Sequence, residues 1–276
     1  MAHTITSMAL FCDFENIALG VRDAKYAKFD IDRVLERLLL KGSIVVKKAY
    51  CDWDRYKEFK GPMHEASFEL IEIPHVRISG KNSADIRLVV DALDLCYTKS
   101  HVDSFVIISG DSDFSPLVSK LRENNKTVIG VGVKSSTSDL LIANCDEFIY
   151  YDDLVRENEK KRRTRRKPAA KTTSATPSTV KDPPKSAEKT EEDRKQEAFD
   201  LVMDTIDALA EERDQDEKIW GSMVKQTLKR RSPGFNESYY GFRTFSDLLE
   251  EAQQRRLLTL EPDQKSGGYI ITRVTG

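Results

Sequence analysis

Residues 104–133 read SFVIISGDSDFSPLVSKLRENNKTVIGVGV and carry the pattern from which the fold can be predicted. It contains an apolar run, FVIIS, then a polar turn, an amphipathic run that starts at Pro116, and a second apolar run, TVIGV. A strand, a helix and a strand in this order predict a β-α-β unit, in which the two strands lie parallel in one sheet.

The same alternation extends outward from this unit over most of residues 8–151. It predicts strands and helices at the following ranges: strands 8–13, 44–51, 69–73, 104–109, 127–133 and 147–151, and helices 30–40, 84–99, 116–123 and 137–143. We therefore expect an α/β fold with a mostly parallel central sheet and helices on both faces. Around Trp53–Phe68 the pattern is ambiguous, because Gly61-Pro62 is expected to break any helix there.

The charge of the chain divides it into three parts. The 276 residues carry a net charge of −2, but residues 1–155 carry −5, residues 156–192 carry +6 and residues 193–276 carry −3. The middle part is rich in Pro, Ser, Thr and Lys and has almost no apolar side chain, so burial cannot offset its ordering entropy. We predict two folded domains, 1–155 and 193–276, joined by a flexible basic linker, 156–192.

The C-terminal part has a different pattern. It predicts three helices and two strands, at 193–212, 219–231, 240–254, 257–260 and 269–273. Three helices and a terminal hairpin are the plan of a winged helix, a fold that often binds nucleic acid. Five basic side chains could follow an RNA backbone or form a solvated surface: Lys225, Lys229, Arg230, Arg231 and Arg243. We expect Trp220, Phe235, Phe242 and Phe245 to lie in the core.

Cysteine usage and hydropathy indicate the compartment. The four cysteines form no CxxC pair and lie in apolar contexts, which predicts buried, reduced thiols. No apolar run approaches the ~20 residues of a membrane span, and the N-terminus lacks the basic region of a signal peptide. We expect a cytoplasmic protein with no membrane partner; its oligomeric state is left open.

Carboxylates follow the predicted strands. Asp13 closes the first strand, Asp111 and Asp113 follow the strand 104–109, and Asp85 opens the long helix. The carboxyl ends of parallel strands meet at one edge of a sheet, where ligands bind. Clustered carboxylates without His or Cys suit Mg²⁺ or Mn²⁺ and not zinc. Such a site could hydrolyse a phosphodiester.

Other residues near these acids are secondary candidates. Asn16 could orient a water or a phosphate oxygen, and Asp91 is a supporting acid that six helical residues rotate away from Asp85. Each acid also has a structural interpretation. Asp85 would complement the dipole of its helix, and Asp113 would shape a turn.

Three segments resemble the NYN domain, a PIN-like nuclease fold: FCDFENIALG at 11–20, KNSADIRLVVDAL at 81–93 and SGDSDFSPLVSKLRENNKTVIGVG at 109–132. The resemblance covers about residues 7–155. It implies a metal-dependent ribonuclease whose acids hold Mg²⁺ or Mn²⁺. Matched by motif, Asp13 and Asn16 fall in the first segment, Asp85 and Asp91 in the second, and Asp111 and Asp113 in the third.

The C-terminal part, from IWGSMVKQ at 219 to the end of YIITRV at 274, resembles an OST-HTH (LOTUS) domain over residues 200–275. This resemblance implies a winged helix that binds RNA, including structured or G-rich RNA. The basic run KKRRTRRK, 160–167, is interpreted as an RNA-binding arm, with a nuclear-localisation patch and a solvated linker as alternatives.

These observations together predict a metal-dependent endoribonuclease whose C-terminal domain recruits single-stranded or structured RNA. The main alternative is a non-catalytic RNA-binding adaptor in which the acids are structural. A weaker alternative is a phosphatase that uses Asp13 as a nucleophile. The residues after Asp13 argue against it, because the second Asp and the Thr of a DxDxT motif are absent.

Overall fold

The structure is a computed structural model that describes residues 6–73, 82–157, 191–211, 218–263 and 268–273. By internal contacts the chain forms two compact units. The first comprises Met1–Val155 with Lys229–Phe235, and the second comprises Arg156–Leu228 with Asn236–Gly276.

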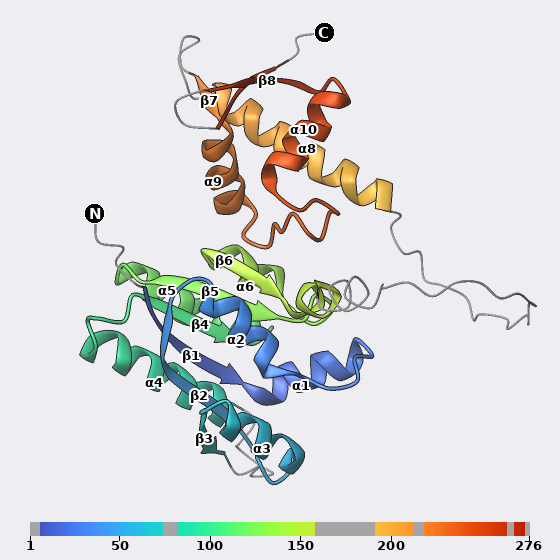
Figure 1. The fold of residues 1–276 in the computed structure, drawn as a ribbon. Helices are drawn as coiled ribbons and strands as arrows, with labels where there is room; N and C mark the ends of the chain where they lie inside the picture. Colours follow the sequence, from blue (N-terminus) through green and yellow to red (C-terminus); the bar gives the residue numbers. More distant parts are fainter. Residues whose placement is uncertain (1–5, 74–81, 158–190, 212–217, 264–267, 274–276) are drawn as a thin grey trace, which may run out of the picture. The chain divides into compact units, whose positions relative to one another are not determined.

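The first unit is built on a six-stranded sheet in the order β3-β2-β1-β4-β5-β6, in which every neighbouring pair is parallel (Figure 1). The strands are β1 (Ser7–Asp13), β2 (Ser43–Cys51), β3 (Glu69–Glu72), β4 (Ser104–Ile108), β5 (Thr127–Gly132) and β6 (Glu147–Tyr150). The predicted α/β class with a parallel sheet is therefore confirmed.

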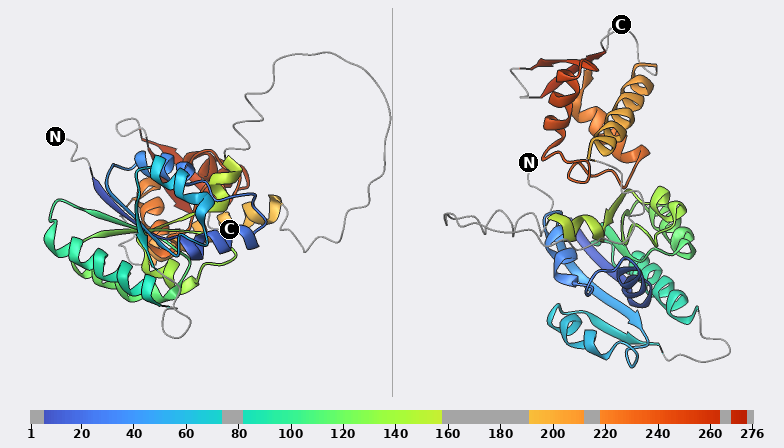
Figure 2. Two further views of the ribbon diagram at one scale, coloured as in Figure 1. Left: turned by 90° about the horizontal axis from the view of Figure 1, so that it is seen from below. Right: turned by 90° about the vertical axis from the view of Figure 1, so that its right-hand side faces the viewer.

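Helices cover both faces of this sheet (Figure 2). One face carries α1 (Phe14–Asp23), α2 (Ile31–Leu39) and α3 (Lys57–Glu65). The other carries α4 (Ser83–Thr98), α5 (Ser115–Glu123) and α6 (Asp139–Asn144), and a short helix, η1 (Ser112–Phe114), precedes α5. Because both faces are covered, the central strands are apolar on both sides, and Met8–Cys12 of β1 is fully buried.

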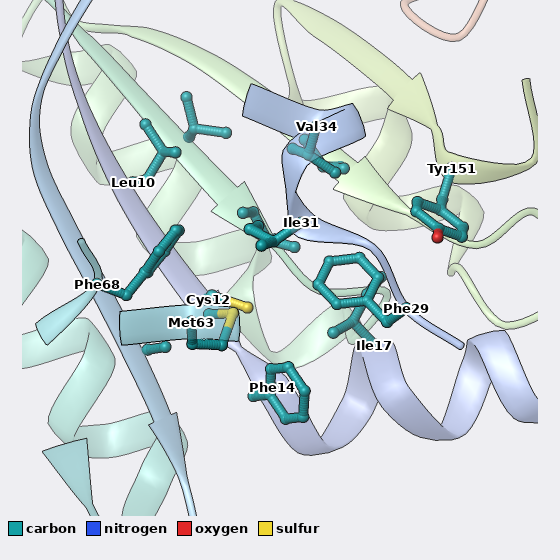
Figure 3. Packing of buried hydrophobic residues seen from close by; sticks show 14 of the residues in the cluster. Leu10, Cys12, Phe14, Ile17, Phe29, Ile31, Val34, Met63, Phe68 and Tyr151 are labelled. Carbon is teal, nitrogen blue, oxygen red and sulfur yellow. The ribbon is translucent and has the colours of Figure 1, made fainter. Parts of the chain in front are cut away.

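The core between the sheet and α1–α3 is rich in aromatic rings. Figure 3 shows Phe14, Phe29 and Tyr151 in this cluster. The ring centroids of Phe14 and Phe29 are 5.9 Å apart, and those of Phe29 and Tyr151 are 5.1 Å apart. Trp53 adds a further ring, 5.0 Å from Phe14. These contacts fix the start of α1, immediately after β1.

Two helices of this unit differ from the expectation. The sequence pattern did not predict α1, which begins directly after β1 because Asp13 caps it by accepting a hydrogen bond from the Asn16 amide. The expected break at Gly61-Pro62 is wrong, since Pro62 lies inside α3. Pro62 has no N–H for the carbonyl of Glu58, and the Nζ of Lys28 donates to that carbonyl instead, at 3.4 Å.

The second unit has the elements of a winged helix. Its described elements are α8 (Glu191–Glu211), β7 (Ile219–Trp220), α9 (Gly221–Arg231), α10 (Phe245–Gln254), β8 (Leu258–Pro262) and β9 (Tyr269–Arg273), with an antiparallel sheet in the order β7-β9-β8. The helix predicted at 240–254 begins five residues later, because Thr244 and Asp247 form a capping box there. Phe235, Phe242 and Phe245 are buried, which confirms their core placement, whereas Trp220 is only half-buried.

The segment between the two units lies mostly outside the described residues, and the basic run 160–167 is part of it. Residues 151–157 are helical and α8 begins at Glu191, so both ends of the predicted linker 156–192 are helical. All four cysteines are buried free thiols. In the part of the chain that the structure describes, no helix is long and apolar enough to cross a membrane.

Candidate acidic site at the carboxyl edge of the sheet

The candidate site lies at the point in the sheet where the strand order reverses. Strand β1 pairs with β2 on one side and with β4 on the other, and later strands add beyond β4. In open parallel sheets the ligand crevice forms at the carboxyl ends of two such strands. Here these ends are Asp13 of β1 and the segment Ser109-Gly110-Asp111 that follows β4.

Asp13 is the most buried acid at this edge, with 6% of its surface exposed. Its Oδ2 accepts a hydrogen bond from the Ser109 hydroxyl at 3.0 Å, and its Oδ1 accepts one from the backbone N–H of Asn16 at 3.3 Å. Burial raises the pKa of Asp13 to about 7, and the charges of Asp85 and Asp111 act in the same direction. A negative charge on Asp13 is therefore costly unless a cation lies beside it.

Asn16 and Ser109 join the two strand ends. The Oδ1 of Asn16 accepts a hydrogen bond from the Gly110 amide at 2.9 Å, so this oxygen holds the backbone after β4. The hydroxyl oxygen of Ser109 also accepts from the Asp111 amide, at 3.2 Å. Ser109 was not predicted as a site residue, although its place between a strand and an acidic turn was a usable signal.

Asp85 comes from the other side of the site, in the first turn of α4. Burial raises its pKa to about 6, and the charges of Asp111, Asp113 and Glu15 add to this effect. These acids therefore lie close enough to Asp85 to repel it. Glu15, two residues after Asp13, was not predicted as part of this group.

Asp111 and Asp113 belong to one turn. The side chain of Asp111 caps η1 by accepting a hydrogen bond from the Asp113 amide at 3.0 Å. Asp111 is half-buried and Asp113 is exposed. The predicted role of Asp113 in shaping this turn therefore falls to Asp111, whose backbone and side chain both have fixed partners.

Asp91 has a different environment from the other acids. Its Oδ2 accepts from the Tyr50 hydroxyl at 2.9 Å and from Lys48 at 3.2 Å, and its Oδ1 accepts from Arg87 at 3.0 Å. Burial raises the pKa of Asp91, but these hydrogen bonds and positive charges outweigh burial and hold it below its ordinary value. In the structure Asp91 attaches α4 to β2 through the ion pair with Lys48 and the hydrogen bond from Tyr50, and its supporting role at the acidic edge stays a prediction.

The donor set at this edge fits a hard divalent cation. Asp13, Asp85 and Asp111 offer carboxylate oxygens, and two of their pKa values are raised. Mg²⁺ is typically held by one or two carboxylates and several waters, so a full cage of side chains is not required. Among the described residues no three acidic, His or Cys side chains form a ready-made metal cage. The chemistry of the site fits Mg²⁺ or Mn²⁺, with water completing the coordination.

The basic residues predicted to contact RNA lie in or near α9. Lys229, Arg230 and Arg231 form its last turn, and Arg230 and Arg231 are exposed. Lys225 is half-buried and forms an ion pair with Glu237 at 2.9 Å, so its charge is partly neutralised. Arg243 is exposed shortly before α10.

Two curated proteins are similar in sequence to part of the chain. The chain is 25% identical over 157 residues to the meiosis regulator and mRNA stability factor 1 of Xenopus tropicalis, covering 57% of this chain and 9% of the relative. It is 29% identical over 121 residues to an uncharacterized protein of Methanocaldococcus jannaschii, covering 42% of this chain and 45% of that protein. The chain thus spans less than half the length of either relative.

A solved structure and a protein family also match part of the chain. A protein of unknown function from Vibrio parahaemolyticus is 27% identical, with a TM-score of 0.49, over 56% of this chain and 98% of its own. The NYN domain family matches residues 7–152, which is more than half of the chain and contains the whole acidic edge. The chain therefore belongs to the NYN domain family.

Proposed function

We propose that this protein is a metal-dependent endoribonuclease whose acidic edge holds Mg²⁺ or Mn²⁺ through Asp13, Asp85, Asp111 and Asp113. The observation that carries the proposal is the meeting of Asp13, Asp85 and Asp111 at the carboxyl ends of β1 and β4, with raised pKa values for Asp13 and Asp85. When bound, such an ion activates a water and neutralises charge on phosphodiester oxygens.

The chain's own groups have defined tasks in this proposal. Ser109 and the Asn16 amide fix the two oxygens of Asp13, which keeps the carboxylate in one orientation. The bond from Gly110 to Asn16 holds the turn that carries Asp111 against the start of α1. Asp85 approaches from α4 and adds negative charge. These contacts hold Asp13 and the turn with Asp111 in place, so that a bound cation would find two fixed oxygen donors, with water and Asp85 completing the set.

RNA recruitment is the task proposed for the second unit, as an OST-HTH (LOTUS) domain. Its three helices and antiparallel sheet suit this assignment, and the last turn of α9, which is counted with the first unit, adds the exposed positive charges of Arg230 and Arg231. Attachment to the nuclease unit would raise the local concentration of single-stranded or structured RNA at the acidic edge. The name of the Xenopus relative, an mRNA stability factor, agrees with a role in RNA metabolism.

A second candidate is a non-catalytic RNA-binding adaptor. One observation favours it: the described side chains form no ready-made metal cage. In that case the acids would serve the fold, and chelation of divalent metal would leave RNA binding and every other activity unchanged.

A cleavage time course separates the two candidates. Labelled single-stranded and hairpin RNAs are incubated with the full chain in Mn²⁺, Mg²⁺ or EDTA, and products are resolved on a denaturing gel. We expect internal cuts with either metal and none in EDTA, because the carboxylates alone repel a phosphodiester. Stable binding without cutting in both metals would support the adaptor.

Charge reversal in α9 tests recruitment. The double variant Arg230→Glu/Arg231→Glu should weaken RNA binding and make the logarithm of the binding constant depend less steeply on the logarithm of the salt concentration. For the loss of two phosphate contacts on a single strand, this slope should fall by about 0.7 per contact. Affinity is measured by fluorescence anisotropy between 50 and 200 mM salt. Lys99→Glu, at the opposite end of α4 from Asp85, is a control that changes charge elsewhere. An unchanged salt slope in the double variant would contradict recruitment by α9.

A further inference from the structure

A pocket of about 390 Å³ opens beside α1. It is lined by one side of α1 near Ala18 and Arg22, by the segment Tyr26–Phe29 and by residues 55–59 before and within α3. Its volume lies in the range of small-ligand sites, roughly 300–1,000 Å³. None of its residues belongs to the acidic edge, so the nuclease proposal does not account for it.

One wall of the pocket is aromatic. Tyr56 and Phe59 are half-buried, and both contact the buried Phe14, with centroid distances of 5.7 and 4.9 Å. Phe14 directly follows Asp13, so the residue that supports this wall is also the first residue of α1. The wall is therefore rigidly connected to the strand that ends in the acidic site.

Positive charge surrounds this aromatic wall. Arg22, Lys28 and Arg55 are exposed residues that line the pocket, while Glu58 is the only acid among its lining residues. Lys28 is held in place by the Glu58 carbonyl at 3.4 Å and lies 4.6 Å from the centre of the Phe59 ring. The Tyr56 ring and these cations thus offer a stacking surface together with partners for a phosphate.

An ion pair connects the pocket to the acidic edge. The guanidinium of Arg55 is 3.2 Å from the carboxylate of Glu15, whose charge also acts on Asp85. Along α1, the pocket residues Ala18 and Arg22 lie about 8 and 14 Å from Asp13 at 1.5 Å per residue. A strand of RNA crossing the acidic edge would therefore reach the pocket with a neighbouring nucleotide.

We propose that this pocket binds one unpaired nucleotide of the RNA substrate, with its base against Tyr56 and its phosphate near Arg22, Lys28 and Arg55. Single-stranded RNA is commonly held in this way, by stacking on aromatic rings and by basic side chains along the backbone. The inference rests on the proposed nuclease function, because it makes the pocket a substrate subsite. Its test uses binding and not cleavage, so the two proposals fail separately.

Photocrosslinking of the full chain in EDTA provides this test. A single-stranded oligonucleotide that contains 4-thiouridine is irradiated with the protein, and the crosslinked peptides are identified by mass spectrometry. We expect crosslinks within residues 18–29 or 53–60. Crosslinks that map only to other parts of the chain would overturn the proposal. So would labelling of the pocket by free 4-thiouridine monophosphate but not by RNA, which would indicate a free-nucleotide site.

Two variants and a control sharpen the result. Tyr56→Ala should lower the pocket crosslink about 5- to 160-fold, the range for loss of one stacked base. Arg22→Glu, whose side chain is 73% exposed and so leaves folding intact, should lower it severalfold. Lys99→Glu should leave it unchanged. Equal pocket crosslinking in all three variants would overturn the proposal. If the wild-type protein crosslinks to RNA at the pocket but does not cut RNA in Mn²⁺, only the nuclease proposal is refuted.

Discussion

Asp13→Asn is expected to reduce metal-dependent RNA cleavage about a thousandfold, the rate equivalent of roughly 4 kcal/mol, and to leave RNA affinity unchanged. The substitution removes the charge of the most buried carboxylate at the edge but keeps an oxygen that can accept from Ser109 or the Asn16 amide. The cap of α1 is therefore retained. Cleavage rates and anisotropy measured on the same RNA check both parts of the result.

The interpretation depends on the variant being folded. Asn at position 13 removes a charge that burial disfavours, so the variant should melt at an equal or higher temperature than the wild type at pH 8 in EDTA. Asp94→Asn, an exposed acid on the same helix as Asp85, is the matched control and should cut RNA at the wild-type rate. Wild-type cleavage by Asp13→Asn, or loss of RNA binding together with cleavage, would contradict this assignment.

The stability of the metal-free protein should fall as the pH rises from about 4 to about 7. The pKa of Asp13 rises from 3.8 to about 7 on folding, so between these values the native state binds more protons than the unfolded state. Stability is then greatest below the unfolded pKa and is lost as the pH passes the folded one. For a group this buried the loss is on the order of 2–4 kcal/mol. The raised pKa of Asp85, about 6, acts in the same direction.

Divalent metal should reverse this loss. At a concentration a hundred times its dissociation constant, Mn²⁺ would stabilise the native state by about 2.7 kcal/mol. Urea denaturation at pH 5 and pH 8, with EDTA or Mn²⁺, measures both effects. Asp13→Asn isolates the contribution of this carboxylate, since its stability should depend less on pH and on metal. Identical profiles for variant and wild type would show that Asp13 neither titrates in this range nor contacts the metal.

The sequence predicted the strands of the first unit closely because their apolar runs are short, buried and separated by polar turns. It did not predict α1, because no loop separates β1 from this helix and Asp13 serves both as strand end and as helix cap. The break expected at Pro62 was wrong because the compensating donor, Lys28, comes from a segment 30 residues earlier. Local patterns carry no information about such a partner.

The candidate site, too, could be predicted only in part from the sequence. The positions of Asp13 and Asp111 after strands follow from the pattern of the chain, and their proximity follows from the parallel sheet. The contacts of Ser109 depend on the register between β1 and β4, which is set by three-dimensional pairing. Asp91 lies on a predictable helix, but its partners Lys48 and Tyr50 lie on a strand more than 40 residues away in sequence. The sequence alone therefore could not separate this acid from the others.

The strand order also determines when the site can form during protein synthesis. Ser109 and Asp13, whose side chains meet at the centre of the site, are 96 residues apart. At roughly 5–20 residues per second, about 5–19 s separate the emergence of these two residues from the ribosome. During this interval the apolar β1 has no β4 to pair with, and its exposed edge is a target for chaperones or for aggregation. The site is thus completed late, together with the step that removes the main folding hazard.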